Sequence, residues 1–290
     1  MWLLVDDGST DATKQLVPEW QAAAPFDVEY VYQENRGKHD AINTGVSRAG
    51  TELFLILDSD DELLPDAIEV IVSAWRAIAE REKPKFAGIW TLCSDPAGQT
   101  LTGPLATDIL DASLQELRYV HRIEEDMLRC FVTDVLRHYR FPVTGPGCPY
   151  IPEGFVWSRI TLRYLIRFLN VPCSRVYYQP DGLIATAREQ YRLSRCVVYA
   201  YLQPLDSDLE WFWSAPSAFL LAAVQLGRYS LFAGELGRHM KTLRWQANAL
   251  VVGALPLAIL LLLKDWATGR IAREVARMDP RLGRNGGAPL

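Results

Sequence analysis

The sequence predicts an α/β protein with a mostly parallel sheet flanked by helices, followed by a helical C-terminal region. Three observations support this fold class. Strand and helix patterns alternate through residues 2–92, and two of the apolar strands end directly in clusters of Asp. A largely aliphatic run with one polar residue, Asn248, occupies residues 247–263. Parallel sheets bind ligands at the carboxyl ends of their strands, so the Asp clusters are the first candidates for a functional site.

The first seven expected elements alternate between strand and helix. They are placed at residues 2–5, 12–24, 28–32, 38–48, 53–57, 65–81 and 86–92. The run 28–32 is β-branched and aromatic, which favours a strand. The run 53–57 has no polar interruption, which is typical of a strand covered on both faces. Such alternation indicates βαβ units.

The pattern changes after residue 95, where Gly and Pro become frequent. We expect a helix at 124–138, another after Pro152, and a strand at 176–178. The domain boundary is placed between residues 205 and 206. This gives a sheet domain over 1–205 and a helical region over 206–290.

Composition excludes several classes of protein. The apolar fraction of 49% and the charged fraction of 22% are those of a globular protein. The net charge of −5 argues against a nucleic-acid binder. The five cysteines do not have the spacing of zinc ligands. Composition therefore indicates a globular protein, and the cysteines are expected to be buried small hydrophobic residues in a reducing compartment.

Two acidic clusters follow two of the apolar strands. They are Asp6-Asp7 and Asp58-Ser59-Asp60-Asp61. In a parallel sheet both would lie at the same edge, where crowded carboxylates repel each other unless a cation binds. An Asp-x-Asp pair such as Asp58 and Asp60 suits Mg²⁺ or Mn²⁺, which bind few carboxylates and fill their shells with water and phosphate oxygens. The alternative is that these residues only cap helices.

A basic loop with one glycine lies between the acidic clusters, in the segment Glu34-Asn35-Arg36-Gly37-Lys38. Gly37 permits close approach of the backbone to a ligand, and the N-terminus of the following helix favours an anion. Lys38 or Arg36 could then neutralise a diphosphate.

Taken together these motifs resemble the family 2 glycosyltransferases over about residues 2–95. The resemblance rests on Val5-Asp6-Asp7-Gly8-Ser9-Thr10-Asp11, on Asn35-x-Gly37-x-x-x-Ala41-x-Asn43, and on Leu57-Asp58-Ser59-Asp60-Asp61. It implies the Rossmann-like GT-A fold, a sugar donor activated by a nucleoside diphosphate (often UDP), and Mn²⁺ or Mg²⁺ as cofactor. The expected enzyme is therefore a metal-dependent glycosyltransferase.

The resemblance also implies roles for single residues. Asp7, together with Asp6, would contact the uridine, and Asn35 and Gly37 would belong to the nucleotide site. Lys38 falls where a basic residue can approach the diphosphate. The metal-binding pair would be Asp58 and Asp60, with Asp61 adjacent.

The segment Pro149-Tyr150-Ile151-Pro152-Glu153-Gly154-Phe155-Val156-Trp157 is similar to the one that supplies the catalytic carboxylate of this family. Glu153 is thus the candidate base that takes a proton from the acceptor hydroxyl in an inverting transfer. The alternative is that Glu153 merely follows Pro152 in the first turn of a helix. Asp126 is the reserve candidate, although a charge run such as Glu124-Glu125-Asp126 is usually a solvated face.

The sequence departs from the family at its beginning. Members normally start with a further strand and helix, and no such unit precedes Trp2. We therefore expect an N-terminally shortened GT-A domain with an exposed apolar sheet edge.

The aliphatic run 247–263 has basic residues on both sides. At ~1.5 Å per residue a helix of this length falls slightly short of a ~30 Å hydrocarbon core. Its flanks fit a helix that lies in an anionic cytoplasmic leaflet, which predicts a cytoplasmic protein at the inner face of the cell membrane. The alternative is an ordinary buried helix.

Three functions remain open. The first is sugar transfer to a glycan or lipid-linked acceptor at that membrane. The second is a sugar-phosphate nucleotidyltransferase, which would also use a Rossmann-like sheet and Mg²⁺. The third is a catalytically impaired protein that binds nucleotide or serves as a membrane-docked scaffold.

Overall fold

The computed structural model describes residues 1–105, 107–123, 126–144, 148–178 and 190–276. The chain forms two compact units, Met1–Gln179 and Pro180–Leu290. The division falls earlier than the boundary expected at 205/206. The reason is that α8 (Ser194–Ser207) packs against α9 (Pro216–Ala233), so it belongs to the helical unit.

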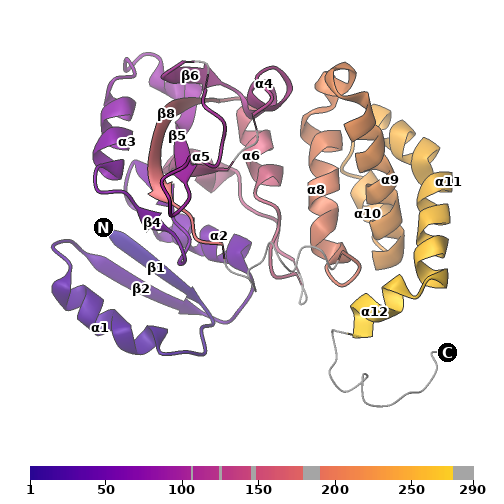
Figure 1. Ribbon diagram of the computed structural model, residues 1–290, viewed down its shortest axis with the longest axis horizontal. Helices are drawn as coiled ribbons and strands as arrows, with labels where there is room; N and C mark the ends of the chain where they lie inside the picture. The colour runs from indigo at the N-terminus through magenta and orange to yellow at the C-terminus, as the bar shows by residue number, and fades with distance from the viewer. Residues whose placement is uncertain (106, 124–125, 145–147, 179–189, 277–290) are drawn as a thin grey trace. The chain divides into compact units, whose positions relative to one another are not determined.

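The first unit begins with a small parallel sheet. Strand β1 (Trp2–Asp7) pairs with β2 (Val28–Gln33), and α1 (Thr13–Ala23) connects them (Figure 1). The register sets Asp7 beside Gln33 at the carboxyl end of the pair. The next helix, α2 (Lys38–Arg48), packs against β1 and has the bounds expected from the sequence.

The second sheet of this unit has six strands. They are β3 (Leu53–Ile56), β4 (Glu62–Leu63), β5 (Phe86–Ser94), β6 (Ile109–Ala112), β7 (Met127–Val132) and β8 (Leu165–Arg175). The order is β3-β7-β5-β8-β4, and β6 also pairs with β8. Strands β3, β5 and β8 run in one direction, whereas β7, β4 and β6 run in the other. The sheet is therefore mixed and not mostly parallel, although the α/β class is confirmed.

Helix α2 connects the two sheets. A Cβ placed on Gly45 of α2 would lie 3.1 Å from Cζ of Phe54 in β3 and 3.6 Å from Cγ2 of Val5 in β1. The helix backbone thus approaches both strands closely. Residues of β1 and β3 therefore both pack against α2 at Gly45.

The core lies around β5, in which every residue is buried. The Trp90 ring makes edge-on contacts with Phe131 of β7 and Phe168 of β8, at centroid distances of 5.6 and 5.7 Å. Helix α3 (Ala67–Arg76) covers one face through Ile71 and Trp75. Strand β3, in contrast, is only half-buried, so the expectation of a strand covered on both faces is not met.

Several other elements differ from expectation. Residues 127–132 form strand β7 where a helix was expected, and only α5 (Thr133–His138) is helical there. The run is a strand because it pairs with β3 on one side and β5 on the other, and tertiary pairing overrides local pattern. Residues 176–178 lie after the end of β8. The described part of the unit also contains helices α4 (Leu114–Tyr119) and α6 (Gly154–Thr161) and the 3-10 helix Lys83–Lys85.

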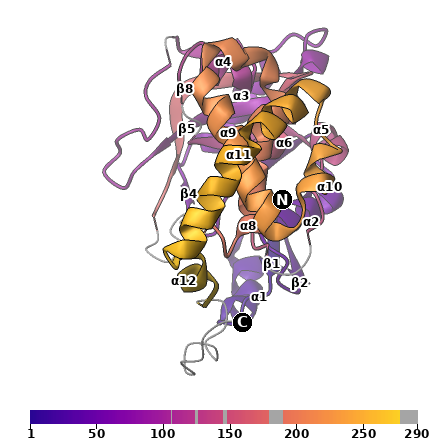
Figure 2. The same cartoon turned by 90° about the vertical axis from the view of Figure 1, so that its right-hand side faces the viewer.

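The second unit is helical. It contains α8, α9, α10 (Leu236–Met240), α11 (Trp245–Ala267) and α12 (Arg270–Ala276), with the 3-10 helix Leu209–Ser214 before α9. Helix α9 packs between α8 and α11 (Figure 1), and Figure 2 shows the unit from the side of α11. A buried ion pair joins Arg228 of α9 to Asp265 of α11, and the Tyr191 hydroxyl donates to the same carboxylate.

Candidate active site

The Asp6 and Asp7 carboxylates organise the loops at the end of β1. Asp6 is buried and accepts hydrogen bonds from the Ser9 backbone N–H at 2.7 Å and from the Tyr30 hydroxyl at 2.6 Å. Asp7 accepts from the backbone N–H groups of Arg36 at 2.9 Å and Gly37 at 2.7 Å. The second acid of the pair therefore holds the basic loop in place.

Gly37 brings that loop against the segment before α6. Its φ of +94° lies in the left-handed region, and a Cβ at this position would sit 2.2 Å from the Pro149 carbonyl oxygen. The next backbone N–H, that of Lys38, donates to the same oxygen at 3.3 Å. Only glycine fits this contact. Packing against Pro149 therefore accounts for the glycine at position 37, where we expected close approach to a ligand.

Lys38 joins three of the expected site regions. Its Nζ lies 2.6 Å from Oδ2 of Asp58 and 2.7 Å from Oε1 of Glu153. Asp58 follows β3, Lys38 begins α2, and Glu153 is the N-cap of α6. Burial opposes the charge of Lys38, but the two carboxylates outweigh it and raise the pKa of the ammonium.

Glu153 is an ionised, half-buried carboxylate with three polar partners. Besides Lys38, its Oε2 accepts from the Arg129 guanidinium at 3.0 Å and from the indole Nε1 of Trp157 at 3.3 Å. Burial opposes ionisation, but the charges of Arg129 and Lys38 outweigh it and lower the pKa of Glu153 to about 2. The residue is therefore more than a helix-terminal glutamate.

Arg129 is the site residue that sequence reasoning missed. It lies in β7 opposite Ile56 of β3, two residues before Asp58, and its guanidinium stacks over the Trp90 ring at 5.3 Å. A signal was present in the sequence. Arg129 is the single charged residue in the apolar run Met127–Val132, and a charge inside a buried strand needs a partner.

The remaining acids of the second cluster differ in environment. Asp60 is exposed, whereas Asp61 is half-buried and accepts weakly from the Tyr177 backbone N–H at 3.4 Å. Burial outweighs that hydrogen bond and, with the charges of Asp58 and Asp60, raises the pKa of Asp61 to about 6.

The carboxylates of Asp58 and Asp60 are ligands of the kind that Mg²⁺ and Mn²⁺ prefer. Asp58 and Asp60 supply two carboxylates, and such ions complete their shells with water and substrate phosphates. Within the described ranges no group of three Asp, Glu, His or Cys is placed to hold a metal. A metal here would thus depend on oxygens from the nucleotide.

Asp126 directly precedes β7, and Asn35 lies in the loop between β2 and α2. Extending the β3–β7 register places Asp126 opposite Ser59, and its carboxylate accepts from the Tyr178 hydroxyl at 2.7 Å. That hydrogen bond raises the pKa of Tyr178 to about 12. Asn35 is exposed, and its backbone N would be 2.7 Å from a Cβ on Gly8.

Asn43, from the same motif as Asn35 and Gly37, has a structural role. Its side-chain amide donates to the Phe141 carbonyl and accepts from the Phe141 N–H, both at 3.0 Å. It therefore ties α2 to the segment after α5.

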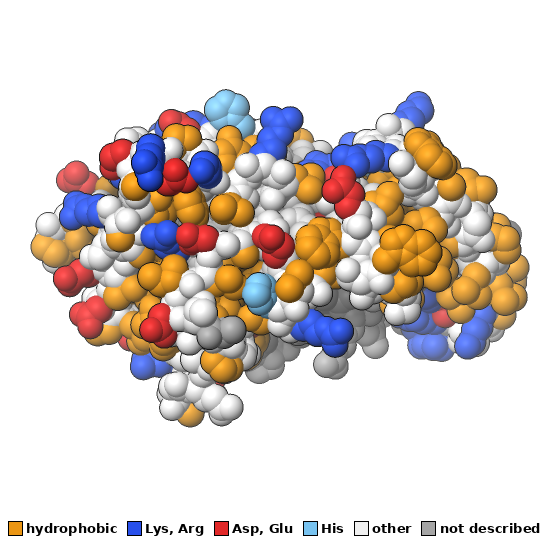
Figure 3. Space-filling view, turned by 90° about the horizontal axis from the view of Figure 1, so that it is seen from above, with side chains coloured by type: hydrophobic (Ala, Val, Ile, Leu, Met, Phe, Trp, Pro, Cys, Tyr) orange, Lys and Arg blue, Asp and Glu red, His pale blue; other side chains and the backbone are white. Residues whose placement is uncertain are grey.

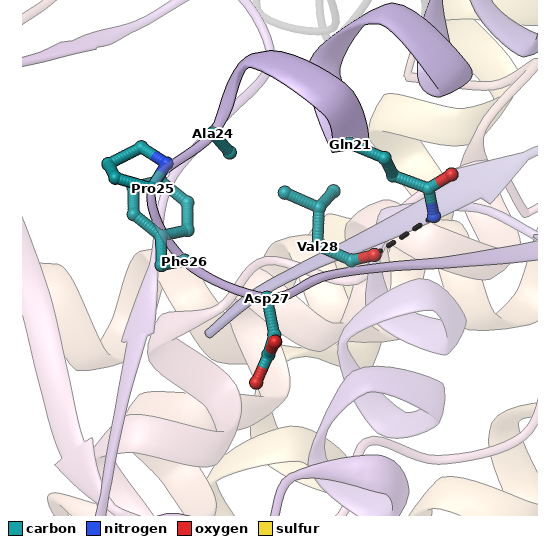
Figure 4. A pocket seen from close by; sticks show the side chains of 6 residues that line it. All are labelled: Gln21, Ala24, Pro25, Phe26, Asp27 and Val28. Carbon is teal, nitrogen blue, oxygen red and sulfur yellow. Dashed lines mark hydrogen bonds between the residues drawn. The ribbon is translucent and has the colours of Figure 1, made fainter.

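A pocket of about 460 Å³ lies at the opposite end of the small sheet. Figure 4 shows its lining residues around the α1–β2 connection, where the Gln21 amide donates to the Val28 carbonyl. Because β1 and β2 are parallel, this pocket is at the amino end of β2, away from the acidic clusters. It does not belong to the candidate site.

Comparison with known proteins matches residues 2–80 to the family model "Glycosyl transferase family 2". A chondroitin synthase of Escherichia coli is 40% identical over 73 residues, which are 25% of this chain and 10% of that protein. An undecaprenyl-phosphate 4-deoxy-4-formamido-L-arabinose transferase of Pseudomonas fluorescens is 36% identical over 83 residues, 28% of this chain and 22% of that protein. The matches span less than a quarter of the length of these relatives.

Solved structures are similar over most of the chain. The crystal structure of S. aureus TarS residues 1–349 with UDP-GlcNAc has a TM-score of 0.57 at 14% identity, covering 92% of this chain and 82% of that one. The same protein with UDP has a TM-score of 0.53 at 16% identity, covering 99% and 84%. At this identity the likeness shows the fold. The resemblance drawn from the motifs is confirmed over residues 2–80, which match the family model, and the solved structures show that the chain has the GT-A fold.

Proposed function

We propose that the protein transfers a sugar from a nucleoside-diphosphate donor, UDP-linked in our preferred case, to a hydroxyl of a glycan or lipid-linked acceptor. The observation that supports this most is the Lys38 ammonium, which contacts Asp58 of the Asp-x-Asp cluster and Glu153 together. A candidate metal ligand and a candidate base thus lie within reach of one side chain. A transferase needs both at the bond that breaks.

The nucleotide would bind at the end of β1. Asp7 accepts three hydrogen bonds, two from the 36–37 backbone and one from the Gln33 amide at 2.7 Å. A carboxylate has about four acceptor sites, so Asp7 keeps one for a uridine N–H. Asp6, buried behind it, would fix the turn, and the Asn35–Gly37 loop would border the uridine.

Asp58 and Asp60 would hold Mn²⁺ or Mg²⁺, with Asp61 beside them. When bound, this ion would stabilise the departing diphosphate. Lys38 would neutralise a further phosphate charge, because it begins α2, where the helix N-terminus also favours anions.

Glu153 would take the proton from the acceptor hydroxyl as it attacks the anomeric carbon, which gives inversion. Its ionised state suits a proton acceptor, and Trp157 and Arg129 orient it. Asp126 is the second candidate, because it lies at the same sheet edge and is exposed.

We also propose contact with the inner face of the cell membrane through α11. This helix is long and apolar enough, by length and composition, to cross a membrane, with a mean hydropathy of 2.1. Only a stripe that includes Ala247, Val251 and Ala258 is buried, whereas Trp245 and Trp266 at its ends are 75% and 73% exposed. Figure 3 shows hydrophobic side chains gathered over the helical unit that contains α11. A lipid-linked acceptor would be reached from such a surface.

The direct test is release of UDP from a panel of UDP-sugars with Mn²⁺ and candidate acceptors. Release with one donor, abolished by EDTA, supports the proposal. UDP binding without release from any donor would favour an impaired, nucleotide-binding protein. Formation of a UDP-sugar from UTP and a sugar phosphate would instead favour a nucleotidyltransferase.

A further inference from the structure

The Lys38 ammonium lies between the two carboxylates that matter most at the site. It is 2.6 Å from Asp58 and 2.7 Å from Glu153, and its side chain is 31% exposed. Both contacts are charge-assisted hydrogen bonds of normal length. The ammonium therefore acts as the counter-cation of Asp58.

The backbone around Lys38 restricts where this side chain can go. Its N–H donates to the Pro149 carbonyl, and Gly37 before it is wedged against the same oxygen. The side chain thus pivots from a fixed Cα. Within the described residues the Lys38 ammonium forms ion pairs with Asp58 and Glu153, which belong to different structural elements.

A divalent cation and the Lys38 ammonium compete for Asp58. The ammonium contacts Oδ2, and a cation on either carboxylate oxygen would lie close to it, where like charges repel strongly in a half-buried site. Metal binding at Asp58 is therefore weak until Lys38 moves away. An anion that receives the ammonium would lower the free-energy cost of that movement, and a diphosphate is such an anion.

Glu153 would not be left unpaired when Lys38 moves. Arg129 contacts its other oxygen at 3.0 Å, and Trp157 donates to that oxygen as well. The removal of one of two cationic partners makes the carboxylate a stronger base, because opposite charges favour its ionised form. Movement of Lys38 would therefore affect the metal site and the base together.

We propose that Lys38 is a resident cation that competes with the metal at Asp58 until the donor diphosphate draws it away. By pairing with the diphosphate in turn, it makes metal binding and nucleotide binding cooperative. Metal alone then binds weakly, and metal with nucleotide binds tightly. This inference rests on the proposed function, since it assumes a metal at Asp58.

The test is Mn²⁺ binding without nucleotide, followed through the electron paramagnetic resonance signal of free Mn²⁺. Lys38→Gln should bind Mn²⁺ alone about 10-fold more tightly than wild type does. The factor by which UDP increases the affinity for Mn²⁺ should shrink by a similar amount, because coupling between two sites is reciprocal and typically about 5- to 150-fold. Lys38→Met, which keeps the alkyl stem, should behave alike. Thermal unfolding checks that both variants fold.

Arg36→Gln is the matched control. It removes a positive charge two residues away, but its guanidinium pairs with Asp40 at 2.8 Å and not with Asp58 or Glu153. We expect its affinity for Mn²⁺ alone to stay within about twofold of wild type, because exposed charges are screened.

The outcomes separate the two proposals. Unchanged or weaker Mn²⁺ binding in both Lys38 variants, with UDP and Mn²⁺ still binding wild type, would overturn the resident-cation inference alone. An equal gain in Arg36→Gln would also overturn it, since general charge would then explain the effect. Wild type that binds no UDP with Mn²⁺ would overturn the proposed donor site and this inference with it.

Discussion

Gly37 lies against Pro149 so closely that no other residue fits. A Cβ at position 37 would be 2.2 Å from the Pro149 carbonyl oxygen, and the backbone φ is +94°. This contact connects the loop between β2 and α2 with the segment that leads to Glu153. The two halves of the candidate site are therefore joined through backbone atoms.

Gly37→Ala should lower the free energy of unfolding by about 2–4 kcal/mol, because left-handed strain and a steric clash act together. Chemical denaturation measures this change. Gly98→Ala is the control, since Gly98 has a similar φ of +85° but nothing within 4 Å of its Cβ position. We expect about 1 kcal/mol there. Equal losses would show that the contact with Pro149 is unimportant.

Asp7→Asn should weaken UDP binding by about 10-fold and leave the fold intact. The substitution removes the charged acceptor that holds the Arg36 and Gly37 N–H groups and that we propose for a uridine N–H. Hydrogen bonds to charged groups contribute about 1.5–3 kcal/mol. Calorimetry measures the affinity. Asp11→Asn, an exposed acid that accepts from Thr13 in the same motif, should leave UDP affinity unchanged. Equal effects would contradict the role given to Asp7.

Glu153→Gln should reduce turnover by about 10²–10⁴, the usual contribution of a general base. UDP and Mn²⁺ should still bind, which separates a catalytic loss from a binding loss. Asp126→Asn serves as the comparison and should retain most activity. The reverse ranking would transfer the role of base to Asp126.

Stability should depend on the protonation of Asp61. Its pKa is raised from 3.8 to about 6, so the folded state binds the proton more tightly than the unfolded chain. This contribution to stability is complete below pH 3.8 and is lost as the pH rises through about 6. In the absence of metal, Asp61→Asn should reduce the pH dependence of the unfolding free energy between pH 3.8 and about 6. An unchanged profile in the variant would contradict the raised pKa.

Membrane contact should depend on the exposed face of α11. Leu260→Glu places a charge on an apolar residue that is 62% exposed, and we expect about 10-fold less binding to vesicles that contain phosphatidylglycerol. Ile68→Glu, at an equally apolar position 52% exposed on α3, is the control. Cosedimentation measures both. No binding by wild type would refute the membrane proposal.

The sequence predicted the helices and strands whose conformation is set by the pattern of their own residues. Helix α2 has the predicted bounds, and β1, β2, β3 and β5 lie within two residues of theirs, because each has its own periodic or β-branched signal. Strand β7 was not predicted, since its conformation depends on pairing with β3 and β5. Arg129 was missed with it, because its role appears only once β7 lies beside β3.

The sequence selects the residue types of the candidate site but not the contacts between them. Motif spacing selected Asp58, Lys38 and Glu153 from distant parts of the chain. The bridge that Lys38 makes between the two carboxylates depends on the packing of α2 against Pro149. No pattern within one segment carries that information.

The most direct measurement of the central claim is a calorimetric titration of UDP into the protein, first with Mn²⁺ and then with EDTA. The donor-site assignment predicts micromolar binding with Mn²⁺ and at least about 10-fold weaker binding with EDTA, the size typical of coupled sites. Absence of UDP binding under both conditions would contradict it.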